Sequence, residues 1–230
     1  MSRRISEDFN AFSDFLQKYN LNSYNSAEQQ VEECKAMHKK LYGLMIFTSE
    51  FKYRGQHNDC AKFLDEVSSD LLISLFCAVQ GMYKPAKLQL RCSIENLLKA
   101  LVSISVPHIV EEKSVYAIFD AAKVDKHFLT TYGVKSIASL KNDYSTLCRT
   151  VHGDPTVMHP TSALALLPQY DVALLQDLAT LYTRMIENSL GILYLNYPAL
   201  VDSMHPENKK DFLDCLSKAT KGEIVNILFG

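Results

Sequence analysis

The segment from Pro85 to Ser105, PAKLQLRCSIENLLKALVSIS, constrains the fold of this chain more than any other. Its eight leucine, isoleucine and valine residues would surround most of a helix, and its leading proline suits a first helical turn. A helix that is apolar on almost every side is typical of the centre of a fold, so we predict a central helix here. Arg91, Glu95 and Lys99 nevertheless recur at every fourth position, along one line of that helix. On a central helix such charges have to be paired, solvated in a cleft or used in function.

The glycine and proline content favours long helices over a turn-rich sheet. The 230 residues include only eight glycines and seven prolines, and no alternating apolar and polar run is flanked by a hairpin turn. Hydrophobic residues make up 47% of the chain, which is ordinary for a globular protein. We therefore predict an all-α fold, a single-domain up-down helical bundle with a peripheral N-terminal helix.

Helix caps, apolar stripes and prolines locate the other elements. We predict helices or helical turns at residues 6–19, 26–53, 59–81, 111–123, 126–133, 136–151, 170–197 and 206–219. Ser6, Ser26 and Ser136 are the predicted N-caps. Residues 155–169, which contain three prolines, are predicted to be the longest loop, and the apolar tail 224–229 is expected to dock on the bundle.

The charge and the cysteines limit the partners and the compartment. A net charge of −2 gives no overall attraction for nucleic acid or anionic lipid, so such a site has to be a local patch. No uninterrupted apolar run reaches the ~18 residues of a membrane span, and the N-terminal MSRRISEDFN lacks the apolar core of a signal peptide. The six cysteines are scattered without a CxxC pair, which is typical of reduced core residues. We expect a soluble cytoplasmic protein with no membrane partner.

The line of Arg91, Glu95 and Lys99 is the first candidate for chemistry. An inward-facing line of this kind would bind a phosphate or hold a catalytic histidine. The alternative is a salt-bridged stripe on a partly exposed face, where each pair contributes a few tenths of a kcal/mol. The apolar residues on the other sides of the helix leave both interpretations open.

The second candidate lies in the segment YSTLCRTVHGDP, which contains Tyr144, Arg149 and His152. His152 falls at the end of a predicted helix, directly before Gly153. It would either cap the last carbonyls of that helix or face a cleft and move protons near neutral pH.

Other chemistries have less support in the sequence. His152, Asp154 and His159 lack the His-x-x-x-His or Cys-pair spacing of a metal site. The chain contains no Walker A, GxGxxG or GxSxG motif, so we expect neither a metal nor another cofactor. The remaining histidines, His38 and His127 among them, are expected at the surface or in loops.

Taken together, the two candidate groups resemble a known pattern. Arg-x-x-x-Glu in an apolar helix, followed by Tyr-x-x-Leu and a helix-ending His-Gly, resembles uncharacterised bacterial proteins grouped with the HEPN superfamily (higher eukaryote and prokaryote nucleotide-binding domains). The matching residues are Arg91, Glu95, Tyr144, Leu147, His152 and Gly153. The resemblance covers roughly residues 59–197. It implies a HEPN-like core at residues 58–200, with N-terminal helices in 1–57 packing on it and a C-terminal helix and tail in 201–230.

The resemblance also implies a function. Active HEPN proteins are metal-independent ribonucleases, many of them in toxin–antitoxin, phage-defence and abortive-infection systems, and they often act as dimers. The implied partners are RNA or a nucleotide, a cognate antitoxin or regulatory protein, and a second copy of the chain. The candidate catalytic set is His152, Arg91, Glu95, Arg149 and Tyr144.

One departure from the family pattern concerns the catalytic Arg and His. The HEPN motif places them four to six residues apart, whereas Arg149 and His152 have only two residues between them. In a ribonuclease, His152 would be the general acid or base, Arg91 or Arg149 would stabilise the phosphorane, and Glu95 would orient Arg91 or the His. The alternative is a non-catalytic helical module that binds a partner protein or a nucleotide in a cleft around Arg91 and His152.

Overall fold

The computed structural model describes residues 2–18, 28–54, 58–151 and 170–230, and these residues form helices and no strand. The predicted all-α class is therefore confirmed for the described parts of the chain. The α-helices are α1 (Arg3–Lys18), α2 (Glu28–Tyr53), α3 (Asn58–Val79), α4 (Tyr83–Val102), α5 (Val115–Val124), α6 (Thr131–Val151), α7 (Val172–Asn196), α8 (Pro198–Asp202), α9 (Pro206–Asp214) and α10 (Lys218–Phe229). Two 3₁₀ turns, η1 (Pro107–Glu111) and η2 (Lys126–Phe128), flank α5.

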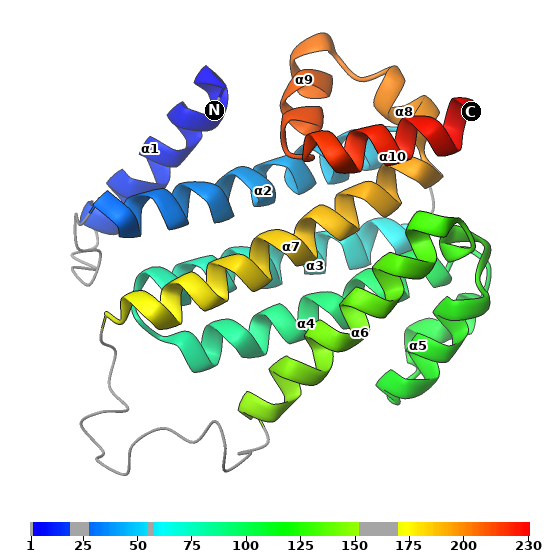
Figure 1. Ribbon diagram of the computed structural model, residues 1–230, viewed down its shortest axis with the longest axis horizontal. Helices are drawn as coiled ribbons and strands as arrows, with labels where there is room; N and C mark the ends of the chain where they lie inside the picture. Colours follow the sequence, from blue (N-terminus) through cyan, green and yellow to red (C-terminus); the bar gives the residue numbers. More distant parts are fainter. Residues whose placement is uncertain (1, 19–27, 55–57, 152–169) are drawn as a thin grey trace.

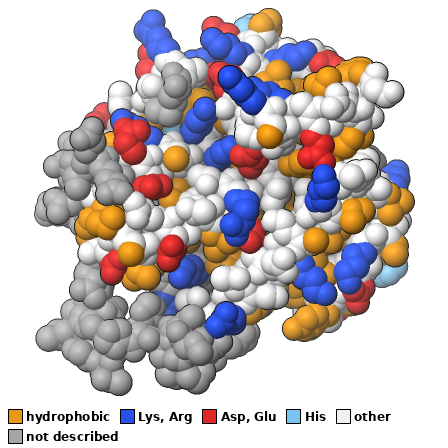
Figure 2. All heavy atoms as spheres, viewed as in Figure 1, with side chains coloured by type: hydrophobic (Ala, Val, Ile, Leu, Met, Phe, Trp, Pro, Cys, Tyr) orange, Lys and Arg blue, Asp and Glu red, His pale blue; other side chains and the backbone are white. Residues whose placement is uncertain are grey.

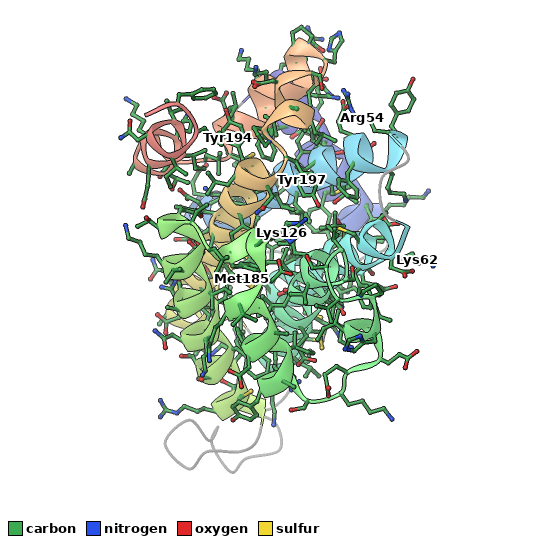
Figure 3. The ribbon with its side chains drawn as sticks, turned by 90° about the vertical axis from the view of Figure 1, so that its right-hand side faces the viewer. Arg54, Lys62, Lys126, Met185, Tyr194 and Tyr197 are labelled. Atoms are coloured by element: carbon green, nitrogen blue, oxygen red, sulfur yellow. The ribbon has the colours of Figure 1, made fainter. Side chains whose placement is uncertain are left out.

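The five long helices α2, α3, α4, α6 and α7 form the bundle. Figure 1 shows them side by side, while α8, α9 and α10 gather at one end and α1 projects from the body. The most extensive pairing joins α3 and α4, and α7 packs against both α2 and α6. Figure 3 shows Met185 of α7 in the interior of this bundle and Lys62 of α3 at its outer edge. Within the described residues, no helix combines the length and the apolar character needed to cross a membrane.

The segment that begins at Pro85 forms the central helix, as predicted. Pro85 lies in the first turn of α4, where a missing N–H costs nothing. Leu90, Ile94 and Leu98 of α4 are completely buried, and the helix contacts α3, α5, α6 and α7. Burial on several sides explains why its sequence is apolar around most of the circumference.

The predicted N-caps Ser6 and Ser136 are wrong. Ser6 lies inside α1, and the Oγ of Ser2 accepts the hydrogen bond from the backbone N–H of Ile5 instead. Ser136 is buried inside α6, which begins five residues earlier than predicted, at Thr131. A serine before an apolar stripe therefore did not mark the first helical residue in either case. Ser26 and the predicted loop 155–169 lie outside the described residues.

Two other predicted boundaries also differ. The helix predicted at 111–123 begins at Val115, because the Oγ of Ser114 caps it and η1 precedes it. The helix predicted at 206–219 ends at Asp214, and the chain then begins α10, so the expected apolar tail is the second half of a helix. Ser217 is the N-cap of α10, since its Oγ accepts from the backbone N–H of Thr220.

The partly buried carboxylate of Glu187 on α7 holds the start of α10 in place. The Oε1 of Glu187 accepts from the backbone N–H of Ser217 at 2.9 Å and from the hydroxyl of Thr220 at 2.7 Å. Its Oε2 accepts from Nζ of Lys40 on α2 at 2.7 Å. Burial alone would raise the carboxyl pKa, but these donors outweigh it and lower the pKa of Glu187 to about 2. Glu187 thus ties together α2, α7 and α10.

We expect Glu187→Gln to lower the free energy of unfolding at pH 7 by about 1–3 kcal/mol, measured by urea denaturation. The folded pKa of Glu187 lies below its ordinary value of 4.5, so its stabilisation is present above pH 4.5 and is lost as the pH falls toward 2. The difference in the free energy of unfolding between the wild type and Glu187→Gln should therefore decrease below pH 4.5. Glu223→Gln breaks only the more exposed pair with Lys135 and should change stability by less than about 0.5 kcal/mol. Equal losses from the two variants would contradict the role given to Glu187.

A close approach of α2 to the end of α9 requires glycine at position 43. A Cβ there would lie 2.6 Å from Sγ of Cys215, a thiol that also donates to the carbonyl of Lys39. No described atom lies within 4 Å of a Cβ placed on Gly222 in α10. Both glycines therefore lie in helices, but only a Cβ at position 43 would collide with a neighbouring side chain.

Gly43→Ala is expected to destabilise the protein by about 1–3 kcal/mol because α9 has to move away from α2. Gly222→Ala is expected to stabilise it by up to about 1 kcal/mol through helix propensity alone. Thermal unfolding of both variants checks this pair, and a stabilised Gly43→Ala protein would show that the α2–α9 contact is wrong.

Candidate functional site

Three of the five predicted site residues meet where α4 packs on α6. The hydroxyl of Tyr144 donates a hydrogen bond to Oε1 of Glu95 at 3.0 Å and accepts one from Nη2 of Arg91. Nη2 of Arg91 also lies 3.1 Å from Oε1 of Glu95. The three side chains thus form a closed triangle of polar contacts across two helices that are distant in sequence.

Helical spacing explains why these residues are brought together. Arg91 and Glu95 are four residues apart on α4, and Tyr144 and Cys148 are four apart on α6, so each pair shares a helix face. Nε of Arg91 donates to Sγ of Cys148 at 3.3 Å, and its guanidinium carbon lies 4.9 Å from the centroid of the Tyr144 ring. The same ring forms a T-shaped contact with Phe119 of α5, with 5.7 Å between centroids. The tyrosine is therefore held by a cation–π contact and an aromatic contact as well as by hydrogen bonds.

Partial burial sets the protonation states of this cluster. The exposed fractions of the Arg91 and Glu95 side chains are 21% and 24%, and Tyr144 is 8% exposed. Burial and the negative charge of Glu95 both raise the phenol pKa of Tyr144, so its hydroxyl stays protonated at neutral pH. Burial opposes the charge on Arg91, but Cys148, Glu95 and Tyr144 outweigh it and raise the guanidinium pKa. The site thus combines one paired positive charge, one paired negative charge and a neutral phenol.

A small hollow opens beside the cluster, between α5 and α6. It has a volume of about 170 Å³, and its lining includes Tyr144 and Cys148 as well as Lys141 and Phe119. A cavity of this size has room for a few water molecules or a phosphate-sized group, which is smaller than a typical ligand pocket of about 300–1,000 Å³. Figure 2 shows basic and acidic side chains interspersed over the face in view, without a broad basic surface.

The predicted charged line of α4 divides into two parts. Lys99 does not join the cluster, because its Nζ donates to the carbonyl of Val110 at 3.1 Å and lies 5.8 Å from the ring centroid of Phe63. Of the three residues on this line, Arg91 and Glu95 contact Tyr144 and belong to the polar cluster. Lys99, which was not among the five candidate site residues, thus contacts a different part of the fold from Arg91 and Glu95.

The other two predicted site residues are not placed in this cluster. Arg149 lies on the last turn of α6 with an exposed side chain, and it is not among the partners of Arg91, Glu95 or Tyr144 given above. His152 lies outside the described residues, as do Asp154 and His159. Among the residues that the structure does describe, no three His, Cys, Asp or Glu side chains are grouped to hold a metal ion.

Sequence reasoning missed Cys148 and misplaced His38. Cys148 was expected to be an ordinary core cysteine, although its spacing of four from Tyr144 would have put it on the same face. His38 is buried inside α2, whereas His127 lies on the short turn η2 as a buried residue, and each ring contacts an aspartate. His38 Nε2 lies 2.8 Å from Oδ2 of Asp8, and Nδ1 of His127 contacts Oδ1 of Asp125. These pairs hold α1 on α2 and shape the turn at η2, so we assign them structural roles.

The hydrogen bond between Tyr144 and Glu95 is testable by a double-mutant cycle. We expect Tyr144→Phe and Glu95→Gln each to destabilise the protein by about 0.5–1.5 kcal/mol, with a coupling energy of at least about 0.5 kcal/mol. Chemical denaturation of wild type, both single variants and the double variant gives the coupling. Strictly additive losses would mean that the two side chains do not interact in solution.

Comparison with known proteins identifies no relative of this chain. No protein-family model matches it, and no curated protein and no solved structure matches it. What can be said about its function depends on the geometry of this cluster and on the resemblance of the motifs that form it.

Proposed function

We propose that the chain is a HEPN-like effector that cleaves RNA without a metal ion, at a site formed by Arg91, Glu95 and Tyr144 and completed by His152. The observation that carries the proposal is the mutual contact of Arg91, Glu95 and Tyr144. The resemblance linked two short motifs that are far apart in sequence, and the fold gives an independent reason to treat them as one site. His152 directly follows Val151, the last residue of α6, the helix that carries Tyr144.

The proposed chemistry is an internal transfer at a phosphodiester. An imidazole can exchange a proton near neutral pH, and His152 is the proposed base that removes the proton of the 2′-hydroxyl as the 2′-oxygen attacks the neighbouring phosphorus. The bond to the 5′-oxygen breaks, that oxygen takes up a proton, and a 2′,3′-cyclic phosphate remains. Solvent water supplies that proton, and His152 then releases to solvent the proton that it removed, so the protons balance.

Arg91 is the proposed stabiliser of the phosphorane. Its Nη2 and Nε are engaged by Tyr144, Glu95 and Cys148, whereas none of the contacts of the described residues uses its Nη1. That N–H group is oriented by the rest of the cluster and can donate to a phosphate oxygen. Glu95 and Tyr144 act as positioning residues, and Arg149 on the last turn of α6 offers a second cation.

The proposal includes a biological setting that the resemblance implies. The effector would act in the bacterial cytoplasm as part of a toxin or phage-defence system. It would form a homodimer that brings two Arg/His sets together, and a cognate antitoxin or regulatory protein would restrain it.

A second candidate function is a non-catalytic module that binds a partner protein or a nucleotide at the same place. The observation that favours it is the compensation of Arg91 by Glu95 at 3.1 Å within a partly buried cluster. A charge that is already paired contributes less to transition-state stabilisation than a free one, and paired charges also occur in purely structural sites. The two candidates differ in whether RNA is cleaved.

The deciding experiment incubates purified full-length protein with end-labelled RNA in the presence of EDTA. We expect cleavage to products with 2′,3′-cyclic phosphate ends, identified by their resistance to 3′-end ligation until the cyclic phosphate is removed. His152→Ala and Arg91→Ala should each slow cleavage at least ~100-fold, because they remove the proton-transfer group and the charge stabiliser.

His108→Ala is the matched control, since His108 is an exposed histidine on η1 and should leave the rate unchanged. Circular dichroism of each variant separates loss of activity from loss of folding. Intact RNA with the wild type, together with nucleotide binding that Arg91→Ala weakens, would favour the second candidate. Cleavage that is unaffected by Arg91→Ala would show that the site lies elsewhere.

A further inference from the structure

An apolar groove lies between α1 and α3, away from the polar cluster. Its lining is Phe12 and Phe15 of α1 with Leu72, Ile73 and Phe76 of α3, and its volume is about 400 Å³. The exposed fractions of Phe15, Leu72 and Ile73 are 45%, 44% and 43%. Three large apolar side chains gathered at one groove differ from scattered exposed hydrophobic residues, which need no explanation.

The packing of α1 explains why the groove stays open. α1 buries Ile5, Phe9 and Leu16 and packs on α2, where Phe9 contacts His38, and Figure 1 shows α1 projecting from the bundle. Phe12 and Phe15 lie on the flank of the same apolar stripe, so α2 does not cover them completely. Burying their exposed surface would contribute about 25 cal/mol per Å².

Two carboxylates of α3 lie outside the apolar lining of this groove, toward the start of the helix. Glu66, Asp70 and Ile73 follow at spacings of four and three residues, so they lie along one face of α3. The other two acidic residues of α3 are each paired with a lysine, Asp59 with Lys62 and Asp65 with Lys52. In the described part of the chain, neither Glu66 nor Asp70 has an ion pair of this kind.

Asp70 is the more unusual of the two carboxylates. It is partly buried, and its contact is the side-chain amide of Asn96, which donates to Oδ2 at 2.8 Å. Burial raises the pKa of Asp70 to about 6, and the nearby negative charges of Glu66 and Glu95 add to the effect. A partly buried carboxylate beside other carboxylates would be stabilised by a cation.

We propose that this groove binds an amphipathic helix of a partner protein, whose apolar side chains occupy the groove while its Lys or Arg residues contact Glu66 and Asp70. Helices that bind in this way use apolar residues at positions i, i+3 or i+4, and i+7. The apolar lining supplies the affinity, and the two carboxylates select a basic helix over an acidic one.

The carboxylates also argue against two other occupants. In a twofold dimer the groove would meet the same surface of a second copy, so the acidic residues would add like charge to the interface. An anionic membrane surface would be repelled by them. The proposal does not depend on ribonuclease activity, because it uses none of the residues assigned to catalysis.

The test uses full-length protein and two synthetic probes in fluorescence anisotropy. One probe is a helical peptide of about 18 residues, or five turns, with leucines on one face and lysines on the other. The second has the same leucines and carries glutamates in place of the lysines. We expect saturable binding of the lysine peptide, weaker by at least about tenfold for Leu72→Ser and for Ile73→Ser, and by a similar factor for the glutamate peptide.

Val134→Ser is the matched control, because Val134 is an exposed apolar residue on α6 and should leave binding unchanged. Asp70→Asn, which can keep a hydrogen bond to Asn96, should reduce the preference for the lysine peptide without loss of folding. Equal binding of both peptides, or binding that Ile73→Ser does not weaken, would overturn the proposal. Sedimentation velocity that shows a wild-type dimer and an Ile73→Ser monomer would assign the groove to self-association and would also overturn it.

Discussion

The burial of α4 among α3, α6 and α7 is the constraint on which the rest of the structure depends. A helix enclosed on several sides has to be apolar around most of its circumference, and any buried polar side chain on it has to find a hydrogen-bond or ion-pair partner. Ser93 meets this requirement within its own helix, by donating to the carbonyl of Leu90. Arg91 and Glu95 pair with each other on α4, and both also contact the hydroxyl of Tyr144 on α6. Their pairing with Tyr144 therefore fixes how α6 lies against α4.

The same constraint limits what the polar cluster can do. A guanidinium that is one-fifth exposed and held by a carboxylate, a phenol and a thiol is rigid, which suits a group that stabilises charge without reorganising. The pairing with Glu95 also reduces the net charge that it offers. The rigidity of Arg91 favours a catalytic role, whereas the compensation of its charge favours a structural or binding role. The cluster by itself is therefore compatible with both functions. A proton-transfer group next to Arg91 is what would separate the two, and for this reason His152 is central to the ribonuclease proposal.

The sequence predicted the elements better than their ends. Apolar periodicity located the long helices because burial of one face is a property of many residues, and Pro85 marked a first turn because its backbone permits little else. The caps failed at Ser6 and Ser136 because a serine inside a helix can also satisfy its hydroxyl locally. At the site, the spacing of four residues correctly predicted that Arg91 and Glu95 lie on the same face of the helix. Nothing in the spacing could show that Lys99 turns to Val110 or that Cys148 joins the cluster, since both depend on the approach of other elements.

Glu95 and Asp70 show how the packing of α3 on α4 produces two different outcomes for a partly buried carboxylate. Glu95 has Arg91 one turn away and a phenol from α6, so its charge is compensated within the fold. Asp70 has the amide of Asn96, and the neighbouring charges of Glu66 and Glu95 make its ionised form less favourable. Folding alone would favour an apolar or a paired residue at that position. A carboxylate with no cationic partner among the described residues, three positions before the groove residue Ile73, is therefore better explained by a contact made outside this chain than by the stability of the bundle itself.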